Sequence, residues 1–172
     1  KRGLHRSAGH VEGVESVRAC IEAAVETGVK YLSLYAFSEE NWNRPESEVS
    51  DLMNLMAKSM LNEMSAMLGN GIRFIVLGHR SRLDAELNAH IDECMERTKD
   101  NDRLTLVVFL SYSGKWDILQ AAKRFAVELA DHPERREELL SCGPEIFDGY
   151  LVTKDIPDPD LMIRTSGEQR LS

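Results

Sequence analysis

Three short apolar runs in this sequence are each followed directly by polar side chains. These side chains are Ser38, Asn41, Trp42 and Arg44 after the first run, Ser111, Tyr112 and Ser113 after the second, and Arg164, Thr165, Ser166 and Arg170 after the third. Because a planar guanidinium can give two parallel hydrogen bonds to one phosphate, arginines at these points predict a phosphate-binding site. An ordinary solvated loop residue is the alternative for any single arginine.

Two further candidates, Arg6 and His10, lie at the start of the first predicted helix. Unpaired backbone N–H groups and the helix dipole favour an anion at such a helix start. A capping or surface role is the alternative for His10.

Charge and motifs exclude several other functions. The chain has 172 residues, with 21 Lys and Arg against 29 Asp and Glu, so its net charge is −8 and we expect no nucleic-acid partner. The glycines form neither a GxxxxGK[ST] loop nor a GxGxxG fingerprint, so ATP and dinucleotide sites lack support, and no HExxH or GxSxG motif occurs. Asp155, Asp158 and Asp160 alternate with prolines, which favours a turn over a metal site.

The elements that must position these residues alternate along the chain between helical and β-type patterns. The predicted strands are residues 30–37, 72–78 and 104–110, with a further short strand at 161–165, and the predicted helices are residues 8–27, 49–68, 82–98, 115–130 and about 144–150. This alternation predicts an α/β fold with a mainly parallel central sheet flanked by helices. Ligands of such sheets gather beyond the carboxyl ends of the strands, which is where the polar residues fall.

Two segments are expected to meet a substrate in different ways. Residues 38–49 lack apolar periodicity yet carry a tryptophan, which predicts a mobile lid. Five of the seven methionines lie on the predicted helix 49–68, namely Met53, Met56, Met60, Met64 and Met67. Because unbranched thioether side chains adapt to apolar ligands, this stripe is a candidate channel wall. A plain core stripe is the alternative.

Length and composition predict one domain over residues 1–172, since 42% of the residues are hydrophobic. No apolar run approaches the roughly 20 residues of a membrane span, and the start of the chain, Lys1-Arg2-Gly3, is polar. Cys20, Cys94 and Cys142 match neither zinc-site nor disulfide-framework spacing. We therefore expect a cytoplasmic protein with three reduced thiols.

The sequence resembles the cis-prenyltransferase family, most closely its bacterial undecaprenyl diphosphate synthase branch, in AGHVEGVESV, LYAFSEENWNRPESEV, SYSGKWDI and DLMIRTSGEQRLS. The resemblance implies the fold of that family and successive cis condensations of isopentenyl diphosphate onto an allylic diphosphate, usually farnesyl diphosphate. It also implies Mg²⁺ as cofactor, a homodimer and peripheral membrane contact during product release. The implied product is a long-chain polyprenyl diphosphate, undecaprenyl diphosphate, from which the lipid carrier of cell-wall peptidoglycan is made.

The resemblance also assigns residues by position. Arg6 and His10 resemble the family's residues at the allylic diphosphate. The strand end and mobile loop that position isopentenyl diphosphate are matched by Phe37, Ser38, Asn41, Trp42, Arg44 and Glu48. The family's residues that bind isopentenyl diphosphate are matched by Arg164, Arg170 and Ser172. Ser38 and Asn41 are the catalytic candidates, which would orient the acceptor or relay the lost proton. The sequence departs from the family pattern at Ser113 and Ser166, where many members have glycine, and at His79, where aspartate is common.

The matching segments begin after the family's first strand and Asp-Gly-Asn-Gly-Arg-Trp loop, and they stop before its metal-binding glutamate. We therefore expect no metal ligand within these 172 residues, and we expect them to be incomplete for activity. Two other functions stay open. One is a non-catalytic family member that supports a partner subunit, which would not need Arg164 and Arg170, and the other is an unrelated phosphate-binding α/β module.

Overall fold

The computed structural model describes residues 6–165 and 167, with the backbone alone for residues 6–11. It divides into two compact units, residues 1–111 and residues 112–172. The single domain over residues 1–172 stays a prediction.

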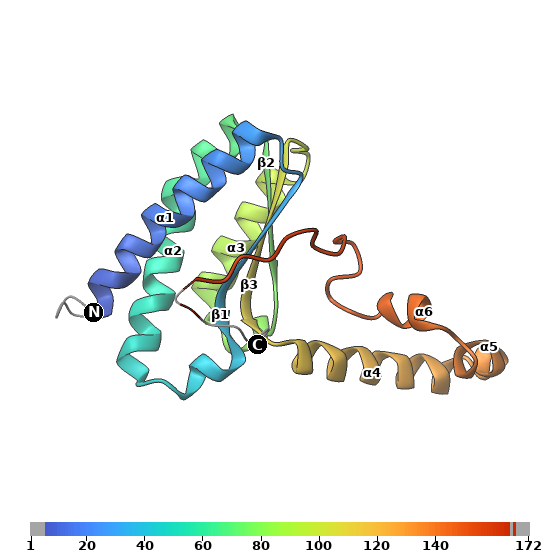
Figure 1. Ribbon diagram of the computed structural model, residues 1–172. Helices are drawn as coiled ribbons and strands as arrows, with labels where there is room; N and C mark the ends of the chain where they lie inside the picture. Colours follow the sequence, from blue (N-terminus) through green and yellow to red (C-terminus); the bar gives the residue numbers. More distant parts are fainter. Residues whose placement is uncertain (1–5, 166, 168–172) are drawn as a thin grey trace. The chain divides into compact units, whose positions relative to one another are not determined.

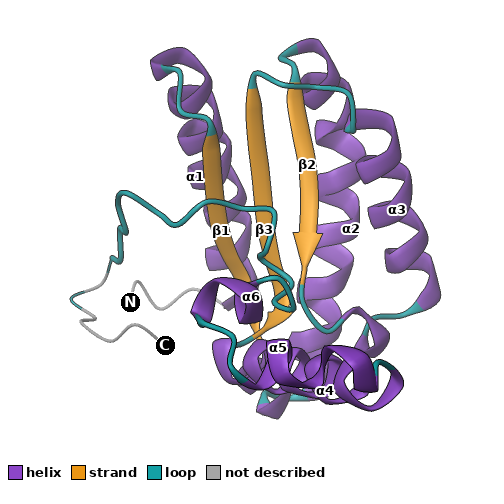
Figure 2. Cartoon of the chain, turned by 90° about the vertical axis from the view of Figure 1, so that its right-hand side faces the viewer, coloured by secondary structure: helices purple, strands orange, loops and turns teal. Residues whose placement is uncertain are grey.

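The first unit is built on a parallel three-stranded sheet. Its strands, β1 (Tyr31–Ser38), β2 (Ile72–Leu77) and β3 (Leu104–Tyr112), lie in the order β1-β3-β2 (Figure 1). The pairing of β2 with β3 runs from Ile72 opposite Leu104 to Leu77 opposite Phe109. Figure 2 shows that one face of the sheet is covered by α1 (Arg6–Thr27), α2 (Glu46–Gly69) and α3 (Ala85–Thr98). The predicted α/β fold with a parallel sheet flanked by helices is confirmed.

Local signals in the sequence set the ends of these helices. Pro45 directly precedes α2, and Glu46 and Glu48 occupy its first turn, where carboxylates interact favourably with the helix dipole. The Asp84 carboxylate caps α3 by accepting a hydrogen bond from the Leu87 N–H at 2.7 Å. Because α2 and α3 begin at these residues, the polar segments that join β1 to α2 and β2 to α3 lie at the carboxyl edge of the sheet.

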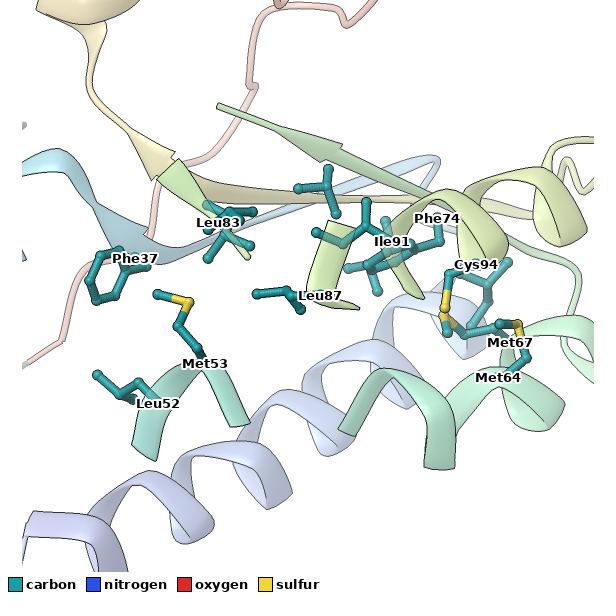
Figure 3. Packing of buried hydrophobic residues seen from close by; sticks show 14 of the residues in the cluster. Phe37, Leu52, Met53, Met64, Met67, Phe74, Leu83, Leu87, Ile91 and Cys94 are labelled. Atoms are coloured by element: carbon teal, nitrogen blue, oxygen red, sulfur yellow. The ribbon is translucent and has the colours of Figure 1, made fainter. Parts of the chain in front are cut away.

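The core of the first unit lies between the sheet and the helices. Alternate residues of β2 are buried, namely Ile72, Phe74 and Val76, as expected for a strand with one face on a core. On α3, Ile91 and Cys94 are completely buried. Figure 3 shows Met64 of α2 beside Cys94, so α2 packs against α3 through this face.

The described part of the second unit contains three α-helices, a 3₁₀ turn at Pro133–Arg135 and an irregular segment. The helices are α4 (Gly114–Asp131), α5 (Arg136–Leu140) and α6 (Pro144–Asp148). The buried Asp117 carboxylate accepts hydrogen bonds from the Tyr112 hydroxyl at 3.1 Å and from the Val152 N–H at 2.9 Å. This carboxylate therefore ties the start of α4 to the chain that follows α6.

The predicted strand at residues 161–165 is wrong, because residues 157–165 contain neither helix nor strand. Their apolar side chains Leu161, Met162 and Ile163 are exposed. A strand needs a neighbour to pair with its backbone N–H and C=O groups, and an apolar composition by itself supplies none.

Cys20, Cys94 and Cys142 are free thiols, as predicted. Within the described residues, no helix combines the length and the apolar character needed to cross a membrane.

Candidate active site

Three segments of the first unit meet beyond the carboxyl ends of the strands. Two are 3₁₀ turns, Glu39–Asn43 after β1 and Arg80–Arg82 after β2. Because β3 is the central strand, Ser111 near its end lies between these two turns. Strand order therefore brings together residues that are far apart in the sequence.

A cluster of side chains around the Glu39 carboxylate joins these segments. Glu39 Oε1 accepts a hydrogen bond from the Ser111 hydroxyl at 2.7 Å and lies 3.2 Å from Nδ1 of His79, while Oε2 accepts one from Arg82 at 2.9 Å. Ser111 Oγ in turn accepts a hydrogen bond from the Trp42 indole N–H at 2.8 Å. We call these five residues the Glu39 cluster, and each of the three segments contributes to it.

The Glu39 carboxylate is stabilised in its ionised form. Partial burial raises the pKa of Glu39, but hydrogen bonds from Ser111 and Arg82 and the charges of Arg82 and His79 outweigh burial and hold this pKa below its usual value. Because the pKa of Glu39 is lower in the folded protein than the value of about 4.3 in the unfolded chain, the charged carboxylate stabilises the fold. This stabilisation is complete above about pH 4.3 and is lost as the pH falls through the pKa of the folded state.

We expect the NMR signal of the Trp42 indole proton to titrate with a midpoint below about pH 4.3. A midpoint above that value would contradict this assignment.

The Trp42 ring is held by contacts on two sides. The Arg82 guanidinium carbon lies 4.5 Å from the ring centroid, and the buried Phe37 ring meets it edge-on at 5.1 Å between centroids. Trp42 is therefore half-buried and is carried by a 3₁₀ turn. Movement of residues 38–49 stays a prediction.

The other predicted residues of this loop are oriented by local contacts. Asn41 Oδ1 accepts a hydrogen bond from the Ser38 N–H at 3.0 Å. This contact fixes the amide orientation and leaves the NH₂ group of Asn41 as the part that can donate to a substrate. Arg44 pairs with Glu48 at 2.9 Å, one helical turn apart, and its guanidinium has more N–H donors than this single pair uses.

The remaining predicted site residues lie elsewhere in the chain. Arg6 and His10 lie at the start of α1, in the part described by backbone alone. Arg164 is exposed in the irregular segment of the second unit. Arg170 and Ser172 lie outside the described residues.

The sequence motifs do not mark Glu39 or Arg82 as candidates, and His79 differs from the family pattern without being a candidate itself. Glu39 and His79 come within two residues of the end of an outer strand, which was the available signal. Their contacts depend on the position of β3 between β1 and β2, and no local pattern in the sequence gives that order.

An apolar cavity of about 590 Å³ lies between the sheet, α1 and α2. Its lining includes Ala36 and Leu110, close to the polar ends of β1 and β3, and reaches Ile72 at the start of β2. Along α2 the lining extends from Leu52 to Asn70, which is roughly 27 Å at 1.5 Å per residue. The cavity therefore follows the sheet from its carboxyl edge towards its amino edge.

The methionines of α2 divide between this cavity and the core. Met56, Met60 and Met67 line the cavity, whereas Met53 and Met64 are buried outside its lining. At about 100° per residue, the first three project within roughly 40° of one another, and the other two share the adjacent face. The core alternative is therefore confirmed for Met53, Met64 and Met67, which are all buried, whereas a channel along Met56, Met60 and Met67 stays a prediction.

The described residues do not fit a metal ion. Within residues 6–165 and 167, no three His, Cys, Asp or Glu side chains form a group that could hold one. Asp155, Asp158 and Asp160 are among the residues to which this statement applies.

Comparison with known proteins identifies the family. A family model described as putative undecaprenyl diphosphate synthase matches residues 1–172. The isoprenyl transferase 2 of Bradyrhizobium diazoefficiens is 42% identical over 99% of this chain, and the ditrans,polycis-undecaprenyl-diphosphate synthase ((2E,6E)-farnesyl-diphosphate specific) of Pseudomonas aeruginosa is 45% identical over 100% of it. This chain spans 67% of the length of each.

A solved structure agrees with these sequence relatives. The lavandulyl diphosphate synthase of Lavandula x intermedia, crystallised with dimethylallyl diphosphate, superposes with a TM-score of 0.92 at 30% identity, over 99% of this chain and 73% of that one. The chain therefore belongs to the cis-prenyltransferase family, among the undecaprenyl diphosphate synthases.

Proposed function

We propose that this protein condenses isopentenyl diphosphate in cis onto farnesyl diphosphate and extends it to a long-chain polyprenyl diphosphate, undecaprenyl diphosphate. The apolar cavity is the observation that carries this proposal. It extends from beside the polar edge of the sheet along α2, and a growing hydrocarbon needs such a space next to its charged end. The Pseudomonas relative, whose name includes both farnesyl diphosphate and the undecaprenyl product, supports the choice of substrates.

The reaction needs no protein nucleophile. The allylic C–O bond breaks as diphosphate leaves, the alkene of isopentenyl diphosphate forms the new C–C bond, and a proton is lost. Positive and N–H donor groups must stabilise the charge that develops on the leaving diphosphate, and Arg6 and His10 are proposed for this role. Arg164, Arg170 and Ser172 are proposed to hold isopentenyl diphosphate, so that two bound substrates react as an oriented pair.

Ser38 and Asn41 are proposed to orient isopentenyl diphosphate at the end of β1. The contact of Asn41 Oδ1 with the Ser38 N–H favours a donor role for Asn41 over a proton-accepting one. Phe37, Trp42, Arg44 and Glu48 are proposed to shape the same side of the site.

Mg²⁺ is proposed as the cofactor on the family resemblance alone. No step of the reaction is assigned to it, because the described residues form no metal-binding group. The homodimer, the cytoplasmic location and the peripheral membrane contact are proposals on the same basis.

The test is condensation of labelled isopentenyl diphosphate with farnesyl diphosphate by the intact protein, with Mg²⁺ and with a chelator. We expect Mg²⁺-dependent incorporation of label into apolar products that lengthen in steps of one isoprene unit. If a folded protein that binds isopentenyl diphosphate incorporates no label, the catalytic function is refuted and a non-catalytic supporting subunit is favoured.

Replacing Arg164 by alanine should mainly raise the KM for isopentenyl diphosphate, by about tenfold or more, because hydrogen bonds to charged groups are among the strong ones. A fall in kcat would follow if orientation also suffers. Arg136→Ala is the matched control, since it removes another exposed arginine of the second unit. Steady-state kinetics of both variants decide the question, and equal KM values would remove Arg164 from the site.

A further inference from the structure

Glu39 occupies a position that the substrate-binding and catalytic assignments above leave without a role. Its side chain is 19% exposed, and both carboxylate oxygens are in use, Oε1 towards Ser111 and His79 and Oε2 towards Arg82. The charged or titratable groups that face it, Arg82 and His79, both come from the segment that follows β2. One carboxylate therefore holds the turn after β1 against the segment after β2 and the end of β3.

The backbone conformation of Ser111 indicates that the contacts of the Glu39 cluster are a defined feature of the fold. Ser111 is completely buried, and its backbone has a φ of 54°, a left-handed conformation that is uncommon for any residue other than glycine. Such strain persists where the surrounding contacts over-determine it, and it concentrates at functional sites. The Ser111 carbonyl also accepts a hydrogen bond from the His79 N–H at 2.9 Å, which joins the ends of β3 and β2.

The direction of each hydrogen bond makes the Glu39 charge necessary. Because the Trp42 indole can only donate, the Ser111 hydroxyl accepts from it and must give its own proton to Glu39. Arg82 can likewise only donate. The side chain at position 39 must therefore accept at both ends, as a carboxylate does and an amide of the same shape does not.

We propose that Glu39 is a positioning residue for the condensation, one that sets Trp42 and Asn41 in the geometry that receives isopentenyl diphosphate. This inference rests on the proposed function. Glu39 acts through its neighbours: Ser111 anchors the indole N–H of Trp42, Arg82 covers the Trp42 ring, and the same 3₁₀ turn carries Asn41.

The discriminating variant is Glu39→Gln in the intact protein. Glutamine keeps the size of the side chain but offers one acceptor, so either Ser111 or Arg82 loses its contact. We expect the KM for isopentenyl diphosphate to rise about tenfold, with a much smaller change in kcat and in the KM for farnesyl diphosphate. Hydrogen exchange should show lower protection of residues 39–43 and unchanged protection of β2.

Two further variants test whether the effect of Glu39→Gln comes from the Glu39 cluster. Ser111→Ala removes the bridging hydroxyl and leaves Glu39 in place, so it should reproduce the same KM defect, and the double variant should be no worse than the more impaired single one. Glu93→Gln, which breaks an exposed ion pair with Arg97 on α3, is the matched control and should leave the kinetics unchanged.

The outcomes separate this inference from the proposed function. A parent protein that does not condense the substrates contradicts the proposed function. If residues 39–43 are as strongly protected from hydrogen exchange in Glu39→Gln as in the parent protein, the inference is contradicted, whatever the activity of the variant. An equal rise in KM for both substrates, in step with a lower melting temperature, would also overturn it, because general destabilisation would then explain the effect. If Glu39→Gln does not fold, a normal KM in folded Ser111→Ala overturns the inference.

Discussion

Replacing Gly78 by alanine is expected to lower the free energy of unfolding by roughly 3 kcal/mol, which is about 6–12 °C in melting temperature for a chain of this length. An added Cβ would lie 1.9 Å from the carbonyl oxygen of Leu110 and 3.1 Å from that of Ser111, and these backbone atoms cannot rotate away. The φ of Gly78, 142°, is also one that side chains rarely allow. The ends of β2 and β3 must therefore separate, and the Glu39 cluster should be disrupted with them.

Gly69→Ala is the matched control for this substitution. A Cβ added at Gly69, the last residue of α2, meets no atom within 4 Å. We expect the melting temperature of Gly69→Ala to stay close to that of the parent protein or to rise slightly, because alanine has a higher helix propensity than glycine. If thermal melts show Gly78→Ala as stable as Gly69→Ala, the close approach of β2 and β3 at this point is wrong.

Periodicity was sufficient to predict most of the fold. The apolar spacing of residues 49–68 and the β-prone run 104–110 reappear as α2 and β3, because both patterns describe segments that bury one or both faces in the core. The pattern failed at residues 161–165, where three apolar residues do not form a strand. Strand formation depends on a partner, which local sequence does not specify.

The candidate site was predictable in location and less so in its contacts. Ser38 and Asn41 fall at the carboxyl edge of the sheet, as the alternation of strands and helices requires. The Glu39 cluster was not predictable, because it depends on β3 lying between β1 and β2 and on a strained Ser111. From the sequence alone, an acidic residue such as Glu39 in a loop after a strand is expected to be solvated. Only the structure shows that Arg82 and His79 face it.

Replacing Met56 by tryptophan is expected to shorten the product and leave the first condensation nearly intact. Met56 lines the apolar cavity on the same face of α2 as Met60 and Met67. A larger ring there would occupy space that only the later intermediates need, so elongation should stop early while the substrates still bind. Chromatography of product lengths measures this effect, and a thermal melt of the same variant measures its stability.

Met64→Trp separates a cavity effect from a packing effect. Met64 is buried against α3 and does not line the cavity, so the larger ring should overpack the core and cost roughly 1–3 kcal/mol. This variant should therefore melt at a lower temperature and still make the parent product. If Met56→Trp also makes the full-length product, the hydrocarbon does not occupy the cavity along α2, and the wall of the channel has to be sought elsewhere. If both variants shorten the product equally, the division of the methionines between cavity and core is wrong.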